Sequence, residues 1–395
     1  MDDNQSNPSF QIFKLLQQSL EKEDLSGSKI IPIGDEKIYL ISSKGIKREE
    51  NQDRVGFAVI ENQLATRTNL AIAILCDGMG GMEEGGKAAS LAISSFISHL
   101  STAKPDGGLK RLTLKAVQYA NERIFDVFKG KGGSTLSAIV FGFKGCVGLN
   151  VGDSRIYHIN KELDLEQLTT DDTIQGQIVK ESQRADSWLN PSEGDSRLAQ
   201  FVGMGEGIDP HIDDLTKHFH KDGQTGFLLT SDGTHYLGNP MLKTIISKAK
   251  QREDIASRII KASEWLGGHD NASIVLLPSK FFFKDHDVNG DLAIRYRSIF
   301  DDIYITFPGY NSLLEKIQIW NQKRDEILEK DNLTYIYNRS DENNKLYDKK
   351  YGKEKQKESK DTKREGRRVK RGKCKKKNEK KGNKCLGYQA LEITA

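Results

Sequence analysis

The stretch Asn69-Leu-Ala-Ile-Ala-Ile-Leu-Cys-Asp-Gly-Met-Gly-Gly81 decides the fold. Its first half is almost wholly apolar and short, which favours a buried β-strand over a helix. A carboxylate, Asp77, stands where this strand ends, and three glycines follow within four residues. Glycine permits a sharp turn and lets a ligand approach the main chain, because no Cβ is in the way. A lone Asp-Gly pair would indicate only a turn, but the pattern recurs along the chain.

Five carboxylates border predicted apolar strands, three where a strand ends and two just before a strand begins: Asp77, Asp153 and Asp232, and then Asp53 and Asp270. In an antiparallel sheet the end of one strand lies beside the start of its neighbour, so these positions share one rim of a β core. Carboxylates in close contact raise one another's pKa and cost stability unless cations are present. The pattern predicts an acidic rim that binds cations.

The chemistry of this rim follows from its ligand atoms. Oxygen ligands alone select Mg²⁺ or Mn²⁺ over zinc, which prefers His or Cys. Two such ions, bridged by one carboxylate and about 3.5 to 4 Å apart, can activate water for in-line attack on phosphorus. Arg48 lies in the polar loop that leads to Asp53. Its guanidinium is suited to holding two phosphate oxygens, although a lone loop arginine is usually a solvated surface residue.

Six motifs follow one another between about residues 38 and 278: Gly45-x-x-Arg48-x-x-Asn51-Gln52-Asp53, Asp77-Gly78-Met79-Gly80-Gly81 with Gly85 and Ala88-Ala89-Ser90, Gly133-Ser134-Thr135, Gly152-Asp153-Ser154-Arg155, Ser231-Asp232-Gly233 and Asp270-Asn271. Each motif alone is weak, but six in this order are specific. Together they resemble the metal-dependent Ser/Thr protein phosphatases, the protein phosphatase 2C family, of the bacterial type. The resemblance implies an α+β fold, a four-layer sandwich of two central antiparallel β-sheets flanked by helices.

The resemblance also implies hydrolysis of phosphoserine and phosphothreonine in proteins by water that two Mn²⁺ or Mg²⁺ ions activate. Asp77 is then expected to bridge both metals, with the Gly78 carbonyl on one of them. Asp232 and Asp270 are expected to hold the other metal, and Asp153 with Asp232 a looser third ion. The expected partners are phosphoproteins, with a cognate Ser/Thr kinase as a further candidate.

By the same resemblance, Arg48 binds the phosphate and Asp53 supports metal-bound water, so both are expected to be catalytic. Gln52, Asn271 and His269 are expected beside the ligands. His269 could assist proton transfer, but a lone histidine near a ligand, such as this one or His235, is usually structural.

Two positions depart from the family pattern. Met79 stands where many eukaryotic members carry a histidine proposed as the general acid, so water or another group must protonate the leaving alkoxide. Gln52 stands where an acid is common, which is expected to weaken the water network around the metals. These departures support an alternative, a catalytically weak pseudophosphatase that acts as a binding or regulatory module.

The pattern of the chain divides it into four parts. Residues 1–37 form an N-terminal extension with a helix at 10–20, and residues 38–278 form the phosphatase domain. Within this domain, residues 171–222 lack periodicity and are expected to form an irregular flap, which the resemblance implies lies near the substrate. Residues 279–340 form a C-terminal extension with a helix near 312–329. Residues 341–395 are expected to be a disordered basic tail.

Charge and composition constrain location and partners. The net charge of +4 over 395 residues conceals a tail, 341–395, with 20 Lys and Arg against 9 Asp and Glu. This tail could bind nucleic acid, an anionic membrane or an acidic protein, or could remain solvated. No apolar run is long enough to span a membrane, and no signal peptide is evident. Four cysteines without CxxC spacing fit a reducing cytoplasm.

One further motif is a decoy. Asp285-His-Asp-Val-Asn-Gly-Asp291 matches the first half of an EF-hand loop. The twelfth position is Tyr296, however, where that loop needs a bidentate Glu. We therefore expect no calcium site here.

Overall fold

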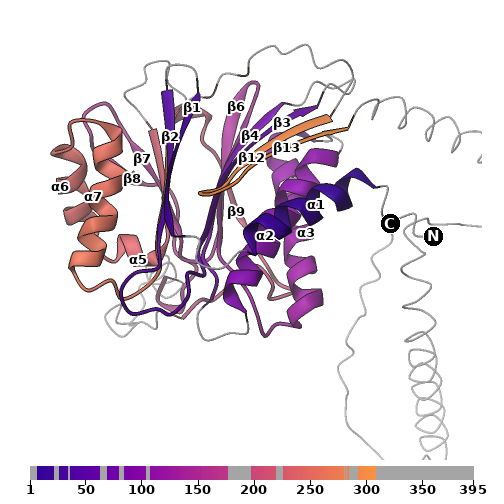
Figure 1. The fold of residues 1–395 in the computed structure, drawn as a ribbon, viewed down its shortest axis with the longest axis horizontal. Helices are drawn as coiled ribbons and strands as arrows, with labels where there is room; N and C mark the ends of the chain where they lie inside the picture. The colour runs from indigo at the N-terminus through magenta and orange to yellow at the C-terminus, as the bar shows by residue number, and fades with distance from the viewer. Residues whose placement is uncertain are drawn as a thin grey trace, which may run out of the picture. The chain divides into compact units, whose positions relative to one another are not determined.

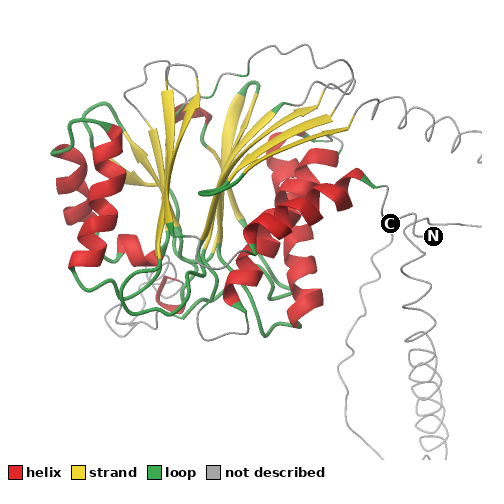
Figure 2. Cartoon of the chain, viewed as in Figure 1, coloured by secondary structure: helices red, strands yellow, loops and turns green. Residues whose placement is uncertain are grey.

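The computed structural model describes residues 7–21, 26–33, 36–62, 69–79, 84–103, 107–176, 197–218, 226–279, 281, 283 and 292–307. All of them belong to one unit of the chain, Met1–Gln318. In this unit two antiparallel sheets stand face to face between two layers of helices (Figure 1, Figure 2). The prediction of a four-layer α+β sandwich is therefore confirmed.

The two sheets differ in how their strands are ordered. The first sheet has, in the described residues, the order β1 (Gly27–Ile33), β2 (Glu36–Ser43), β11 (Ala272–Pro278), β10 (Gly226–Thr230), β7 (Arg155–Ile159) and β8 (Leu165–Gln167). The second sheet has the order β13 (Asp302–Phe307), β12 (Leu292–Arg297), β3 (Arg54–Asn62), β4 (Leu70–Cys76), β5 (Leu136–Gly142), β6 (Gly145–Val151) and β9 (His211–Asp214).

Helices cover the outer face of each sheet (Figure 1). Those on the second sheet are α1 (Pro8–Leu20), α2 (Gly85–Thr102) and α3 (Gly108–Phe128), and those on the first sheet are α6 (Asn239–Ser247) and α7 (Arg252–Trp265). Two short elements, η3 (Thr216–His218) and α5 (Asp232–His235), follow β9 and β10. No helix among the described residues is long and apolar enough to cross a membrane.

Strand β4 explains why the decisive stretch is apolar throughout. Its seven residues are all buried. Leu70, Ile72 and Ile74 pack with the helices on the outer face, and Ala71, Ala73 and Leu75 pack against the first sheet. A strand buried on both faces does not alternate polar and apolar residues, because neither side meets water. A further cluster of buried apolar side chains lies between the first sheet and helices α6 and α7.

The helix expected at 10–20 is present as α1, and the apolar strands expected beside the five carboxylates are present as β3, β4, β6, β10 and β11. The irregular assignment of 171–222 is wrong at His211–Asp214, because β9 pairs there with β6 along the edge of the second sheet.

The sheets also extend beyond both predicted limits of the domain, 38 and 278. Strand β1 pairs with β2 over its whole length, from Gly27 opposite Ser42 to Ile33 opposite Glu36. At the other end of the chain β12 pairs with β3, and β13 pairs with β12. The segments expected as extensions therefore contribute strands to the core. The helix expected near 312–329, the basic tail and the EF-hand-like residues 285–291 lie outside the described residues.

Candidate metal centre

Strand pairing brings the predicted carboxylates to one end of the sheets. Strands β3 and β4 pair with Arg54 opposite Cys76, so Asp53 and Asp77 leave the second sheet at the same end. In the first sheet β10 pairs with β11, with Thr230 opposite Ile274, which places Asp232 after one strand beside the residues that precede the other. Helix α5, which begins at Asp232, lies at the lower end of the sheets in Figure 1.

Four negatively charged side chains act on the buried carboxylate of Asp77. The pKa of Asp77 is raised well above its ordinary value by burial and by the negative charges of the other four: Asp53, Asp232, Asp153 and Asp270. Their proximity is the arrangement expected from the sequence. These five residues include every carboxylate that the sequence predicts as a metal ligand.

Burial is the main cause of the remaining shifts. It raises the pKa of Asp53 to about 7, although hydrogen bonds from Ser273 and Ser231 oppose the increase. It raises the pKa of Asp153 to about 7 and that of Asp232 to about 6, with additional contributions from neighbouring carboxylates. Removing charged carboxylates from water is unfavourable unless a positive charge compensates.

Two buried carboxylate oxygens indicate where a compensating positive charge would bind. Asp53 Oδ1 and Asp232 Oδ1 have no hydrogen-bond donor among the described residues. Buried polar atoms are nearly always satisfied, so such oxygens call for a ligand. A hard divalent cation fits them, because these cations take carboxylate oxygens as ligands. The residues present therefore fit the metal ions that the sequence predicts.

The main chain around Asp77 is fixed by hydroxyl groups from the Gly133-Ser134-Thr135 motif. The Asp77 N–H donates to Thr135 Oγ1 at 2.9 Å, and Ser134 Oγ donates to the Asp77 carbonyl at 2.8 Å. Thr135 Oγ1 also shares a hydrogen bond of 2.7 Å with Ser154 Oγ, which follows Asp153. The motif thus holds two of the acidic segments together.

Gly78 is required by a close approach of the main chain. A Cβ at this position would lie 2.2 Å from the Gly85 carbonyl oxygen and 2.9 Å from the Gln52 carbonyl oxygen. The Gly78 N–H donates to that same Gln52 oxygen at 3.3 Å. The main chain after Asp77 is therefore pressed between helix α2 and the loop that carries Asp53, and a larger residue would separate them.

Arg48 lies at the rim, as predicted. Its Nη2 is 2.6 Å from Asp270 Oδ2, and this hydrogen bond raises the pKa of Arg48. The turn at Gly45 has φ +75°, a conformation that favours glycine. The next two backbone N–H groups, of Ile46 and Lys47, donate to the Gly268 carbonyl at 2.9 and 3.1 Å. The arginine side chain remains substantially exposed and accessible to a ligand.

Asn271 anchors the loop that contains Arg48. Its Nδ2 donates to the carbonyls of Lys44 and Glu50 at 2.9 and 2.8 Å, and its Oδ1 accepts from the Gln52 N–H at 2.8 Å. Gln52 therefore contributes to the site through its main chain, by accepting from Gly78 and donating to Asn271. Both of these contacts use the main chain of Gln52.

The two histidines near the rim play different structural parts. His235 is buried and shares a hydrogen bond of 3.1 Å with Thr230 Oγ1, and burial lowers its pKa well below the ordinary value. His269 is exposed, and its ring lies 6.3 Å from that of Tyr236. This ring contact does not place His269 against a rim carboxylate, so its predicted place beside the ligands stays a prediction.

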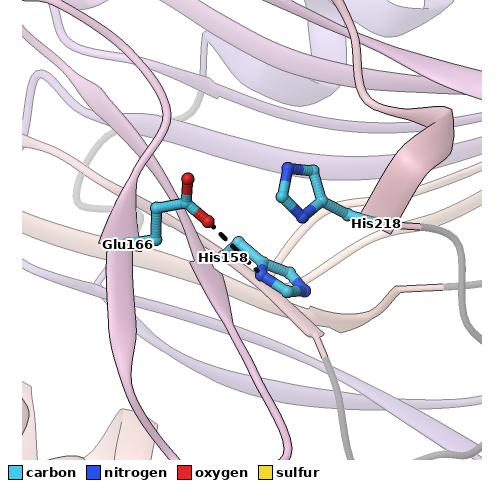
Figure 3. Close-up of side chains that lie close together, drawn as sticks. All are labelled: His158, Glu166 and His218. Carbon is cyan, nitrogen blue, oxygen red and sulfur yellow. Dashed lines mark ion pairs between the residues drawn. The ribbon is translucent and has the colours of Figure 1, made fainter.

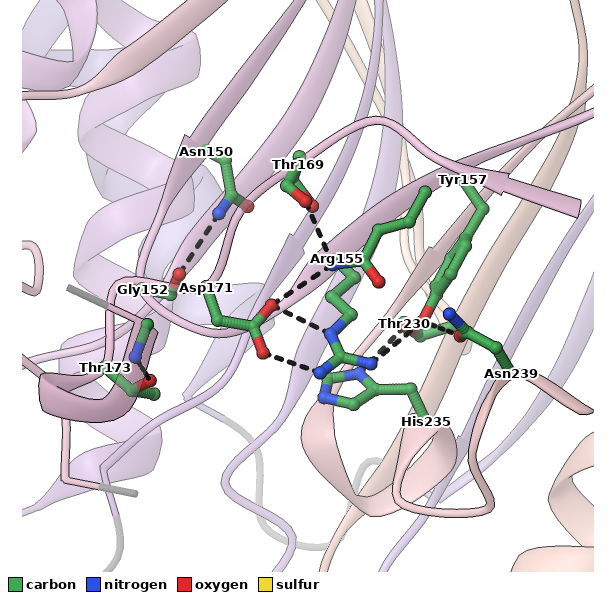
Figure 4. A network of polar contacts seen from close by, with 12 residues as sticks. Asn150, Gly152, Arg155, Tyr157, Thr169, Asp171, Thr173, Thr230, His235 and Asn239 are labelled. Carbon is green, nitrogen blue, oxygen red and sulfur yellow. Dashed lines mark hydrogen bonds and ion pairs between the residues drawn. The ribbon is translucent and has the colours of Figure 1, made fainter. Parts of the chain in front are cut away.

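The structure adds a charged pair that the sequence reasoning did not single out. Arg155 donates through Nε and Nη2 to both oxygens of Asp171, at 2.8 and 2.6 Å, and through Nη1 to the Tyr157 hydroxyl at 3.2 Å (Figure 4). Arg155 comes two residues after Asp153 in the same motif. Its closeness to Asp153 in the sequence is the signal that could have identified Arg155. Its partner Asp171 lies in the stretch expected to be irregular, so the pair itself could not be predicted.

A second missed residue is Arg54, which is buried. Its Nη1 donates to the carbonyls of Asn51 and Asp53 at 2.7 and 2.9 Å, and its Nε donates to the Leu20 carbonyl at 2.7 Å. One guanidinium thus joins the end of helix α1 to the loop that presents Asp53. Helix α1 is a structural support of the rim.

Comparison with known proteins is consistent with this geometry. No family model matches the chain. A Streptococcus pyogenes protein described as a putative protein phosphatase 2C-type is 25% identical over 251 residues, covering 61% of this chain and 96% of the relative. Protein phosphatase PhpP of Streptococcus pneumoniae is 25% identical over 253 residues, and the serine/threonine phosphatase stp of Listeria welshimeri is 25% identical over 262 residues. They cover 61% and 63% of this chain, and 96% and 98% of their own lengths.

Solved structures share the fold. A Streptococcus agalactiae serine/threonine phosphatase superposes with a TM-score of 0.50 at 23% identity, covering 61% of this chain and 98% of that one. Stp1 from Staphylococcus aureus gives a TM-score of 0.51 at 22% identity, covering 64% and 98%. Over about three fifths of its length the chain is similar to bacterial Ser/Thr phosphatases, one of them described as a protein phosphatase 2C-type protein.

Proposed function

We propose that this chain hydrolyses phosphoserine and phosphothreonine in proteins, using two Mn²⁺ or Mg²⁺ ions bound at the carboxylate rim. The observation that carries the proposal is the convergence of five carboxylates at one end of the two sheets. Two of their buried oxygens, on Asp53 and Asp232, have no donor among the described residues. Such a site is costly without cations and suited to them.

We assign the metal ligands from position and ligand chemistry. Asp77 and the Gly78 carbonyl, together with Asp232 and Asp270, would hold the two ions, and Asp153 with Asp232 would hold a looser third ion. When bound, the cations supply a nucleophilic water and neutralise charge on the phosphoryl group.

The protein groups then orient the reaction. The Arg48 guanidinium binds phosphate oxygens, and its ion pair with Asp270 keeps it at the rim. Asp53 Oδ1 accepts a hydrogen bond from the attacking water, while its Oδ2 is fixed by Ser231. Met79 has no proton to give, so water protonates the leaving alkoxide.

The catalytic unit that we propose is larger than the predicted 38–278. Arg54 joins helix α1 to the Asp53 loop, and β12 covers the edge of β3. We therefore place the unit between Pro8 and Phe307, with phosphoproteins as its substrates. Buried Cys76 and Cys146 are free thiols, which fits the reducing cytoplasm that we propose as its location.

The activity is tested with purified full-length chain and a phosphothreonine peptide. We expect turnover with Mn²⁺ or Mg²⁺ and none with a chelator. Asp77→Asn and Asp232→Asn should each lower kcat by at least about a hundredfold, because each removes charge that holds a cation. The matched control is Asp164→Asn, in the exposed turn between β7 and β8. Full activity in either rim variant would refute the assignment.

The same assay tests the alternative that the chain is a catalytically weak pseudophosphatase. Gln52 and Met79 motivated that alternative, but neither replaces a proposed metal ligand, and the relatives carry the names of phosphatases. Metal-dependent turnover by the full chain would exclude it. A chain that binds Mn²⁺ but releases no phosphate would instead support it.

A further inference from the structure

Two histidines and one glutamate meet on the inner side of the first sheet, away from the carboxylate rim (Figure 3). His158 lies in β7 and Glu166 lies directly opposite it in β8. His218 ends η3, which follows the edge strand β9 of the second sheet. One potential ligand atom from each side chain lies within 4.8 Å of the others. The cluster therefore joins two strands of the first sheet to the segment that follows the edge strand of the second.

The packing brings the two imidazoles together at depth. The rings of His158 and His218 have centroids 4.3 Å apart, and these side chains are only 5% and 8% exposed. Phe227 lies in β10 directly opposite His158, and its ring is close to both imidazoles. Glu166 is exposed, and its Oε2 lies 4.0 Å from His158 Nδ1. The carboxylate thus closes the outer side of a buried pair of imidazoles.

The cluster is distinct from the metal centre in place and in chemistry. Arg155, at the rim end of β7, is three residues before His158, a separation of about 10 Å along a strand. The rim offers oxygen ligands only, whereas this cluster offers two imidazoles and one carboxylate. Two His and one Glu, with water as a further ligand, form a known zinc-binding set, and imidazole suits zinc better than it suits Mg²⁺.

We propose that His158, Glu166 and His218 bind one Zn²⁺ or a similar first-row transition metal ion that clamps the two sheets together at this edge. Ligand atoms about 2.0 to 2.1 Å from a tetrahedral zinc ion lie about 3.4 Å apart. The cluster would have to close by up to about 1.4 Å, and Glu166 has an exposed side chain that can move toward the histidines. The competing explanation is that the two imidazoles only pack against Phe227.

The test uses the full chain carrying Asp232→Asn, with excess Mg²⁺, so that zinc binding at the rim is suppressed. We expect one bound Zn²⁺ by calorimetry, a visible Co²⁺ absorption band typical of nitrogen ligands, and a higher Tm with zinc. His158→Asn and His218→Asn should each abolish all three. His99→Asn, a histidine of α2 that contacts Tyr119, is the matched control and should retain them.

A milder variant keeps the test decisive if a buried substitution prevents folding. Glu166→Gln alters an exposed side chain and should weaken zinc binding by about tenfold or more. Its control, Glu162→Gln, removes the same charge from the adjoining turn and should leave affinity unchanged. Equal zinc affinity in the parent chain and in Glu166→Gln, or the same stoichiometry in a folded histidine variant, would overturn the proposal. Phosphatase activity does not enter either outcome.

Discussion

Ser231 Oγ donates a hydrogen bond of 2.7 Å to Asp53 Oδ2, and this contact joins the two sheets beneath the acidic rim. Ser231 follows β10 of the first sheet, and Asp53 precedes β3 of the second. The same hydroxyl accepts from the Ser273 N–H at 2.9 Å. Because one carboxylate oxygen is held in this way, the other oxygen of Asp53 remains available to the rim.

Replacing Ser231 should therefore weaken both the fold and the site. In Ser231→Ala the buried Asp53 carboxylate loses a donor, which should lower the free energy of unfolding by about 1 to 3 kcal/mol. The pKa of Asp53 should rise, so the acid limb of the kcat/KM profile should move to higher pH. Denaturant unfolding and a pH–rate profile measure these effects, with Ser257→Ala on α7 as control. An unchanged acid limb would contradict the assigned coupling.

The metal-free chain should lose stability as the pH rises. Burial raises the pKa of Asp53 to about 7 and that of Asp232 to about 6, whereas an unfolded Asp titrates near 4. Between about pH 4 and 7 the folded chain thus binds more protons than the unfolded chain, and its stability falls with increasing pH. The loss should be on the order of a few kcal/mol.

Thermal unfolding in a chelator from pH 5 to 8 measures this dependence. Added Mg²⁺ or Mn²⁺ should restore the Tm most at the high end of the range, where the carboxylates are charged. The prediction would be contradicted if the Tm of the metal-free chain rose steadily with pH and metal increased the Tm equally at pH 5 and pH 8. The charged carboxylates would then not destabilise the metal-free fold.

Arg48 should act on substrate binding and contribute little to stability. Its pair with Asp270 is partly exposed, and exposed ion pairs contribute about 0 to 1 kcal/mol. Arg48→Ala should raise KM for a phosphopeptide by about tenfold or more, because a charged hydrogen bond to phosphate is lost. Arg48→Lys should restore the charge but only part of the affinity, since the planar fork is missing. An unchanged KM in Arg48→Ala would remove this residue from the site.

Asn271 should be needed to hold the Arg48 loop. Asn271→Ala removes two donors and one acceptor that contact residues 44, 50 and 52. Hydrogen exchange at backbone amides of residues 45–52 should accelerate, and kcat/KM should fall by about tenfold, while exchange in β4 stays slow. If amide protection in this loop were unaffected, Asn271 could not be its anchor.

The local sequence pattern is sufficient to predict the strands that form the acidic rim. Strand β4 is apolar throughout, and each carboxylate stands near a strand end with a Gly, Asn or Arg as a direct neighbour in the sequence. Antiparallel pairing then brings such ends together without any knowledge of which strands are neighbours. The acidic rim was therefore predictable from position alone.

The missed strands depend on distant partners. Strand β1 contains Pro32, which reads as a break in a local pattern but is tolerated because β1 is an edge strand. Strand β9 is short, and its one buried apolar residue, Ile212, gives no periodicity. The hydroxyl groups of Ser231 and Thr135 have no role that the local motifs reveal, because their partners come from remote segments of the chain.

The pairing of β12 with β3 determines how this protein can be shortened. Arg297 lies opposite Phe57 and Leu292 opposite Asn62, so one edge of β3 is satisfied by residues beyond the predicted domain limit at 278. A fragment that stopped there would leave these backbone groups open along a largely apolar strand, a template for aggregation. Failure of such a fragment in solution would report an uncovered sheet edge and would say nothing about its catalytic chemistry.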